Sequence, residues 1–148
     1  MIFITGATGL VGSQLLFDLL SKEEKVLTLK TKNSDTNRLA NIFSSHNELF
    51  NKNIEWVKGD ILDIFSLKEI FKKGVTKVYH CAGIVSFNKT DAEIMMRTNI
   101  NGTANIVSLC VENNIEKLCY VSSVSAINRI NEDETINELE AKAAAIFG

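Results

Sequence analysis

Residues 5–12 read T-G-A-T-G-L-V-G and directly follow the apolar run M-I-F-I at 1–4. The apolar run predicts a short strand, and Leu10–Leu20, with its leucines on one face, predicts a helix. A strand, a glycine turn and a helix in this order bring backbone N–H groups and the positive end of a helix dipole to one point, where a pyrophosphate can bind. A tight strand-to-helix turn without a ligand is the alternative.

Three glycines give this turn its predicted geometry. Gly6 can adopt the positive φ that the turn needs, Gly9 has no β-carbon to keep phosphates away, and Gly12 lets the helix pack closely. Their G-x-x-G-x-x-G spacing differs from the G-x-G-x-x-G dinucleotide fingerprint. Ser13 follows Gly12 without the lysine of a P-loop, which disfavours an NTPase.

Length and composition exclude several other classes of function. The 148 residues suit one domain, and a net charge of −2 without a basic stripe disfavours nucleic-acid binding. No apolar run approaches the ~20 residues of a transmembrane helix, and no basic segment of a signal peptide precedes the first strand. We therefore expect no membrane partner and a cytoplasmic location.

Cysteine and histidine spacing argues against a metal site. Cys81, Cys110 and Cys119 are scattered and form no C-x-x-C pair, which is typical of reduced thiols in a cytoplasmic protein. His46 and His80, the only histidines, are far apart in the sequence. We predict no bound metal.

The remaining chain alternates strand and helix patterns. Further strands are predicted at Val26–Leu29, Ile54–Val57, Val78–Cys81 and Lys117–Val121. Helices are predicted from Leu39 to about Phe50, from a capping box S-L-K-E at 66–69 to Gly74, and from Asp91 to Glu112. Along the last helix one face is predicted at Ile94, Thr98, Gly102, Ile106 and Cys110. The alternation predicts an α/β fold, a Rossmann-type doubly wound parallel sheet with ligands at the carboxyl ends of its strands.

Five segments carry a family resemblance: T-G-A-T-G-L-V-G-S at 5–13, G-D-I-L-D at 59–63, H-C-A-G at 80–83, N-I-N-G-T-A-N-I at 99–106 and Y-V-S-S-V-S-A at 120–126. In this order the chain resembles the extended short-chain dehydrogenase/reductase family, of the NAD(P)-dependent epimerase/dehydratase type and its dihydroflavonol-reductase or 3β-hydroxysteroid-dehydrogenase-like branch. The resemblance implies an NAD(P)-binding domain at 1–135 and hydride transfer to or from a secondary alcohol or ketone. The small-molecule substrate would be a nucleotide sugar or a steroid- or flavonoid-like alcohol. Beyond the resemblance, the alanine-rich composition of residues 136–148 predicts a short helical or frayed tail.

The resemblance also implies coenzyme contacts. The diphosphate turn would comprise Gly6, Ala7, Thr8, Gly9, Leu10, Val11 and Gly12. Asp60, with Ile61 beside it, would hold the adenine through its carboxylate, or Asp60 only caps a turn. The nicotinamide-side ribose would be lined by Cys81, Ala82 and Gly83.

Three further residues match positions near the family's active site. Asn99 would brace the site by hydrogen bonding to backbone, or it is an ordinary surface asparagine. Ser123 matches the catalytic serine that hydrogen-bonds the substrate, and Ser122 would contact backbone or the cofactor. The alternative for both serines is turn chemistry at the end of a strand.

The end of the second strand bears on the choice of coenzyme. An NAD site usually has an acid about 20 residues past the glycines, whereas residues 30–34 read K-T-K-N-S with Arg38 beyond. Cations suit a 2′-phosphate, so we predict NADP in preference to NAD, with Lys30 among the contacts. The alternative is that Lys30 and Lys32 are ordinary surface charges.

The catalytic Tyr-x-x-x-Lys pair that the family needs is not evident. Tyr79 and Tyr120 are the only tyrosines, and neither has a lysine four residues on. The segment E-L-E-A-K-A at 138–143 would place Lys142 at the lysine but Glu138 at the tyrosine, or Lys142 only solubilises an alanine-rich helix. We therefore expect nucleotide binding with little turnover. A non-catalytic regulatory or scaffolding module is the alternative function.

The strand pattern stops before the last strands of the sheet and the substrate lobe that the family would have. We expect a truncated, partly built or separately encoded cofactor half of a longer enzyme. An open sheet edge and exposed apolar helix faces would favour association, a homodimer included, or poor solubility.

Overall fold

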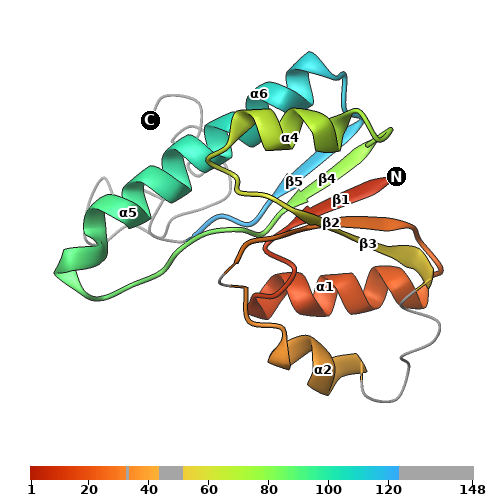
Figure 1. The fold of residues 1–148 in the computed structure, drawn as a ribbon, viewed down its shortest axis with the longest axis horizontal. Coiled ribbons are helices and arrows are strands. Elements are labelled where there is room, and N and C mark those ends of the chain that lie inside the picture. The colour runs from red at the N-terminus through yellow and green to blue at the C-terminus, as the bar shows by residue number, and fades with distance from the viewer. Residues whose placement is uncertain (33, 44–51, 124–148) are drawn as a thin grey trace, which may run out of the picture.

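A parallel sheet forms the centre of the computed structural model, which describes residues 1–32, 34–43 and 52–123 (Figure 1). Its strands are β1 (Ile2–Thr5), β2 (Val26–Lys30), β3 (Ile54–Lys58), β4 (Lys77–His80) and β5 (Lys117–Tyr120). Within the described residues the order is β3-β2-β1-β4-β5 and every pairing is parallel. The predicted doubly wound α/β sheet is confirmed, and the direction in which successive strands are added to it reverses between β1 and β4. The tail at 124–148 lies outside the described residues.

Helices cover both faces of the sheet. On one face lie α1 (Leu10–Ser21) and α2 (Asn37–Phe43), and on the other lies α4 (Ile64–Phe71) (Figure 1). A long helix on the same side as α4 follows the short 3-10 turn η1 (Lys89–Asp91). It comprises α5 (Ala92–Met96), the π-helical turn η2 (Arg97–Gly102) and α6 (Thr103–Glu112).

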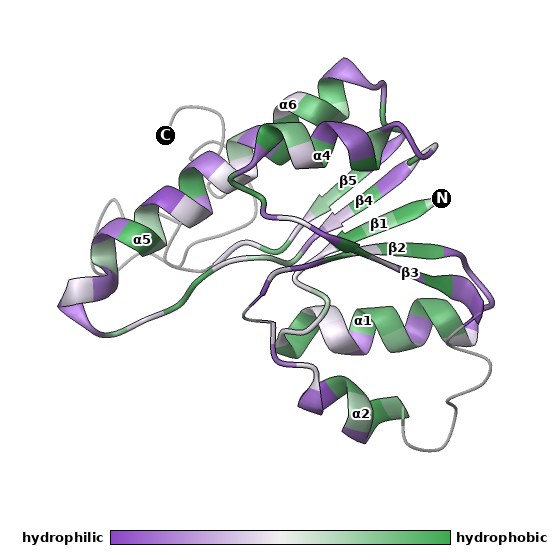
Figure 2. Ribbon diagram, in the orientation of Figure 1, coloured by the Kyte–Doolittle hydropathy of each residue, from purple (hydrophilic) through white to green (hydrophobic). Residues whose placement is uncertain are grey.

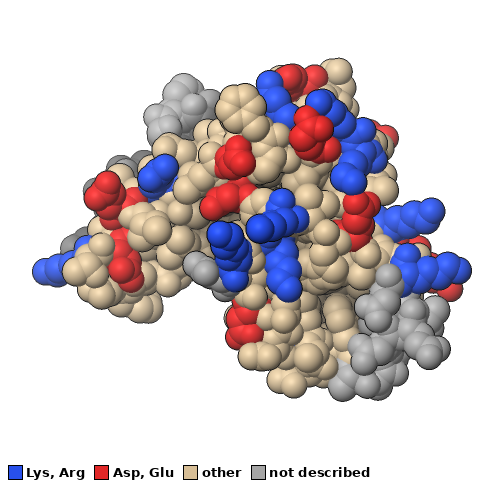
Figure 3. Space-filling model, viewed as in Figure 1, with Lys and Arg blue, Asp and Glu red and all other residues tan. Residues whose placement is uncertain are grey.

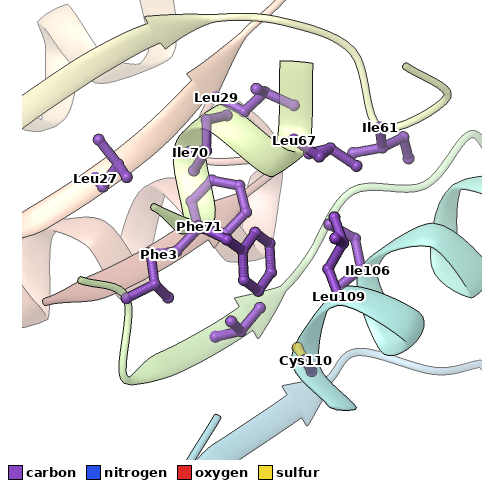
Figure 4. Packing of buried hydrophobic residues seen from close by; sticks show 12 residues of the cluster. Phe3, Leu27, Leu29, Ile61, Leu67, Ile70, Phe71, Ile106, Leu109 and Cys110 are labelled. Atoms are coloured by element: carbon purple, nitrogen blue, oxygen red, sulfur yellow. The ribbon is translucent and has the colours of Figure 1, made fainter. Parts of the chain in front are cut away.

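Each face of the sheet has its own hydrophobic core. Between the sheet and α4 and α6, Figure 4 shows Phe3 among side chains from both helices, and the rings of Phe3 and Phe71 meet edge to face with centroids 5.8 Å apart. Under α1 and α2 the core consists of Ile2, Ile4, Ala7, Leu16, Leu19, Leu20, Val26 and Leu39. Figure 2 shows β1 and β2 as mainly hydrophobic and the helices as mixtures of hydrophobic and hydrophilic residues. β1 is buried along its whole length because it contributes to both cores.

The start of α4 corrects the predicted capping box. Asp63 is the N-cap, and its Oδ1 accepts hydrogen bonds from the backbone N–H groups of Phe65 (3.1 Å) and Ser66 (3.3 Å). Ser66 is already inside the helix and donates its hydroxyl to the Asp63 carbonyl oxygen at 2.9 Å. Both residues can cap a helix, and the structure places the cap three residues before the S-L-K-E box.

The long helix also departs from prediction. Gly102, Ile106 and Cys110 are buried as expected, but Ile94 is 55% exposed. The π turn is one cause, because it inserts a residue and rotates positions before it off the buried face. The other cause is visible in Figure 1, where α5 extends past the ends of the strands.

The helices in the described ranges include none that is both long and apolar enough to cross a membrane.

Candidate functional site

The glycine turn after β1 is packed against the segment that follows β4. Gly6 has a φ of +71°, and a β-carbon there would lie 2.6 Å from the Ala82 backbone nitrogen. A β-carbon at Gly12 would overlap the Gly6 carbonyl oxygen, which also accepts the Gly9 N–H at 3.0 Å. Gly6 and Gly12 are therefore fixed by close backbone packing, whereas Gly9 is exposed.

The N-terminus of α1 has the features of an anion site. Gly9 is the N-cap in an extended conformation, and the helix start has neither a side-chain cap nor an acidic residue in its first turn. The first N–H groups of a helix have no intrahelical partner, and the helix dipole adds positive potential there. This turn can therefore receive a negatively charged group.

A cleft of about 440 Å³ opens at the carboxyl ends of β1, β2, β3 and β4. Eight of the predicted coenzyme residues line it: Gly6, Thr8, Gly9, Asp60, Ile61, Cys81, Ala82 and Gly83. The structure thus brings together the three segments that the sequence assigned to diphosphate, adenine and ribose.

Other predicted residues lie outside the walls of this cleft. Ala7 and Gly12 are buried beneath the turn, while Leu10 and Val11 line a groove of about 620 Å³ between α1 and α2. Lys30 lines a neighbouring groove of about 290 Å³ that shares only Thr31 with the cleft. The exposed Ser122 and Ser123 follow β5 and are not among the cleft walls. Lys142 lies outside the described residues.

Sequence reasoning missed seven residues of the cleft: Leu29, Thr31, Ser34, Leu62, Ile84, Ile94 and Thr98. Thr31 and Ser34 lie in the polar stretch after β2. Their position directly after a strand could have indicated that they line the ligand site. Ile94 and Thr98 had been predicted on the core face of the long helix. The cleft receives them because the helix extends beyond the sheet (Figure 1).

Asp60 caps its own turn. Its Oδ1 accepts the Leu62 N–H at 2.9 Å, and its carbonyl oxygen accepts the Asp63 N–H at 3.0 Å. The turn reading of Asp60 is therefore correct. The Asp60 carboxylate has further acceptor positions, so it can also accept a hydrogen bond from the adenine amine.

The long helix fixes two walls of the cleft through asparagine side chains. Asn105 donates its Nδ2 to the Ile61 carbonyl oxygen at 2.9 Å. Asn99, in the π turn, accepts the Ile84 N–H at 2.8 Å and donates to the Ile84 carbonyl oxygen at 2.9 Å. The expected backbone contact of Asn99 is confirmed, and this residue holds the segment that follows Gly83.

Burial changes the acidity of two of the three cysteines. Burial raises the pKa of Cys81, with the nearby Cys119 adding to the shift, and burial raises the pKa of Cys110 to about 11. Cys81 and Cys110 are therefore neutral thiols at neutral pH. The described residues contain no group of three or more His, Cys, Asp or Glu that could hold a metal ion.

The end of β2 is rich in cations. Lys30 and Lys58 are register partners on adjacent strands, and Lys32 lines the same groove. Figure 3 shows Lys and Arg side chains gathered near the centre of the view, where Figure 1 draws the carboxyl ends of β2 and β3. Asp35 stands nearby, but its Oδ1 accepts the Asn37 N–H at 2.8 Å at the start of α2.

Known proteins resemble this chain in sequence and in fold. The family model for the NAD dependent epimerase/dehydratase family matches residues 2–144. A Synechocystis sp. protein with the provisional name dihydroflavonol 4-reductase is 31% identical over 136 residues, which is 92% of this chain and 36% of that protein. Sterol-4-alpha-carboxylate 3-dehydrogenase (decarboxylating) from Bos taurus is 28% identical over 124 residues, 84% of this chain and 30% of the relative.

Among solved structures, the epimerase Mth375 of Methanothermobacter thermautotrophicus matches with a TM-score of 0.76 and 26% identity. The match covers 94% of this chain and 40% of Mth375. The chain thus spans between 30% and 40% of the length of these three proteins. From the family match and the shared fold, the chain belongs to the NAD dependent epimerase/dehydratase family.

Proposed function

We propose that this chain is the coenzyme-binding part of an NAD(P)-dependent oxidoreductase or epimerase. The observation that supports this most is the cleft in which the glycine turn, Asp60 and the 81–83 segment converge. Family membership and the relatives named above point the same way. The substrate class that we propose is a secondary alcohol or ketone of a small metabolite, either a nucleotide sugar or a steroid- or flavonoid-like alcohol.

The residues present fit a dinucleotide. The crowded contact of Gly6 with Ala82 leaves backbone, not side chains, at the turn, and the α1 N-terminus offers N–H donors to the two phosphates. Asp60 would accept the adenine amine, and the 81–83 segment would line the nicotinamide ribose. When bound, the coenzyme supplies hydride transfer.

The 2′-phosphate of NADP has a suitable place beside Thr31. Lys30, Lys32 and Lys58 surround the groove that meets the cleft there. Like charges in register, such as Lys30 and Lys58, are destabilising unless an anion lies between them. Three lysines line this groove, whereas the stretch 30–38 holds one acid, Asp35, whose Oδ1 accepts the Asn37 N–H at the start of α2. We therefore favour NADP over NAD.

A second candidate function is a nucleotide-binding regulatory or scaffolding module. It is favoured by the position of Tyr79 and Tyr120, because Tyr120 lies within β5 and Tyr79 within β4, and neither has a lysine four residues on. The two functions differ in turnover. A full gene product that oxidises or reduces a secondary alcohol with NADP(H) supports the enzyme, and binding without turnover supports the module.

Coenzyme titration tests the shared part of both functions. Trp56 lines the groove that shares Thr31 with the cleft, so NADPH or NADH should change its fluorescence and raise the melting temperature. Gly9→Val should abolish binding and Gly9→Ala should weaken it, since the side chain would occupy the space of the phosphates. No response to either coenzyme at millimolar concentration would overturn the proposal.

The choice of coenzyme has its own test. Lys30→Gln and Lys58→Gln should each weaken NADP binding about fivefold, which corresponds to about 1 kcal/mol for a charge pair near water. NAD affinity should stay within about twofold. Lys22→Gln is the matched control, because Lys22 is an exposed lysine at the other end of α1. Equal losses for NAD and NADP would contradict the 2′-phosphate site.

A further inference from the structure

A chain of hydrogen bonds crosses the protein interior beneath the cleft. The His80 Nδ1 lies 2.6 Å from the Thr5 Oγ1, and the His80 Nε2 lies 2.9 Å from the Thr103 Oγ1. The Thr5 Oγ1 also accepts the Ala82 N–H at 3.2 Å. Thr5 and His80 are 0% and 1% exposed. The chain therefore links β1, β4 and α6, with its Thr5 end buried and its Thr103 end part-buried.

The buried imidazole meets the two hydroxyls in its neutral form. Burial lowers the pKa of His80 to about 4, so the ring is neutral at physiological pH. A neutral imidazole has one N–H donor and one acceptor nitrogen. One threonine must therefore donate to the ring while the other accepts from it. The Tyr120 ring stacks on His80 with centroids 5.3 Å apart, which further restricts the imidazole.

The Thr5 hydroxyl lies where two walls of the cleft meet. Thr5 precedes Gly6 of the glycine turn, and its hydrogen-bond partner Ala82 belongs to the opposite wall. The backbones of these walls are already in close contact at Gly6 and Ala82. A displacement of the Thr5 hydroxyl would therefore change the separation of both walls.

The other end of the chain fixes the helix that completes the site. Thr103 directly follows the π turn η2, whose Thr98 lines the cleft and whose Asn99 holds Ile84. His80 and Asn99 thus attach the segment after β4 to the long helix at two points, one on each side of Ala82.

We propose that His80 is a positioning residue for the coenzyme, which sets the separation between the glycine turn and the 81–83 segment by holding Thr5 and Thr103 together. His80 does not itself line the cleft, so its effect passes through Thr5 and Ala82. This inference rests on the proposed coenzyme function and adds a buried histidine to it.

Threonine variants provide the test. The dissociation constants of NADPH and NADH would be measured by Trp56 fluorescence, together with urea unfolding, for Thr5→Val, Thr5→Ser and Thr28→Val. Thr28 is the matched control, since it is 0% exposed and donates its hydroxyl to the Ile4 carbonyl oxygen at 3.1 Å. Thr5→Val should weaken coenzyme binding about tenfold, or about 1.4 kcal/mol. Thr5→Ser should restore it to within about twofold.

The control separates positioning from general stability. Thr28→Val should lower the unfolding free energy as Thr5→Val does but leave coenzyme affinity within about twofold. Equal loss of affinity in both variants, or unchanged affinity in Thr5→Val, would overturn the proposal.

Hydrogen exchange at the Ala82 amide supplies a readout that needs no coenzyme. Exchange should be about tenfold faster in Thr5→Val and His80→Gln, and unchanged in Thr28→Val. If His80→Gln does not fold, Thr5→Val decides the result. A wild-type chain that binds neither coenzyme would refute the proposed function, whereas unchanged Ala82 exchange in Thr5→Val would refute the positioning role alone.

Discussion

The side chain of Asn99 pairs with both backbone groups of Ile84, accepting its N–H at 2.8 Å and donating to its carbonyl oxygen at 2.9 Å. The two residues are 15 apart in sequence, and this contact spans the loop between β4 and the π turn. It supplies the hydrogen bonds that the loop backbone would otherwise seek from water.

Removal of this contact should loosen the loop. Asn99→Ala leaves two part-buried backbone groups unpaired, so we expect a loss of about 1–3 kcal/mol in unfolding free energy. Asn101→Ala, at an exposed position in the same π turn, is the control and should cost less than about 1 kcal/mol. Urea denaturation measures both. Equal losses in the two variants would contradict a specific contribution of the Ile84 contact.

Two glycines with similar positive φ values should lose different amounts of unfolding free energy when each is replaced by alanine. Gly6 and Gly74 have φ values of +71° and +77°. A β-carbon at Gly6 meets the Ala82 and Cys81 backbones, while one at Gly74 meets nothing within 4 Å. Gly74→Ala should cost about 1–2 kcal/mol from conformation alone. Gly6→Ala should cost at least about 2 kcal/mol more, as measured by thermal or urea unfolding; equal costs would contradict the packing described here.

Stability should fall with acid because of His80. The folded-state pKa of about 4 lies below the usual 6.5, so between these values the unfolded chain binds more protons than the folded one. The contribution of neutral His80 to the free energy of unfolding is complete above pH 6.5 and is lost as the pH falls to 4. Its maximum is about 3 kcal/mol. The described contacts of the ring are with the hydroxyls of Thr5 and Thr103 and with the aromatic ring of Tyr120.

Carboxylates also make stability depend on pH, so the contribution of His80 is measured by comparing the wild type with a variant that lacks this histidine. Urea unfolding of wild type and His80→Asn would be compared at pH 7 and pH 4.5. The wild-type protein should lose more stability over this interval than the variant, because asparagine does not titrate. A variant with the same pH dependence as wild type would contradict a buried neutral His80.

Asp63 should be the residue that starts α4. Asp63→Ala removes the acceptor for two backbone N–H groups and should cost about 0.5–2 kcal/mol in unfolding free energy. Ser66→Ala removes only a hydroxyl donated to a carbonyl oxygen inside the first turn, so its cost should be smaller. A larger effect at Ser66 in urea unfolding would restore the S-L-K-E box as the cap.

Local signals explain why much of the fold could be predicted. The apolar run of β1, the glycine turn and the leucine face of α1 are contiguous in sequence, and strand and helix alternation is enough to predict a parallel sheet. The cap of α4 was misplaced because Asp63 and Ser66 are both good N-caps and sequence alone does not rank them. The π turn was missed because no residue type marks an inserted residue in a helix.

The candidate site was predictable where residues follow directly from strand ends. Gly6 was predicted from the glycine turn after the first strand, Asp60 and Ala82 were supplied by the family resemblance, and all three line the cleft. Ile84 and Thr98 were not predicted, because their position depends on how far the long helix extends beyond the sheet. The hydrogen bonds of His80 to Thr5 and Thr103 join residues 75 and 23 apart, so no spacing rule could reveal them.

The walls of the cleft come from four strand ends that are far apart in the chain. Loops can open by local fluctuation, and of these four the turn after β1 and the segment after β4 are directly joined. A dinucleotide that contacts all four loops would make their opening cooperative. A loop could then open only if the coenzyme dissociated, which would also break the coenzyme's contacts with the other loops. Coenzyme addition should therefore slow amide hydrogen exchange in the turn after β1 and in the loops after β3 and β4. The free energies of opening calculated from these exchange rates should become similar in the three segments.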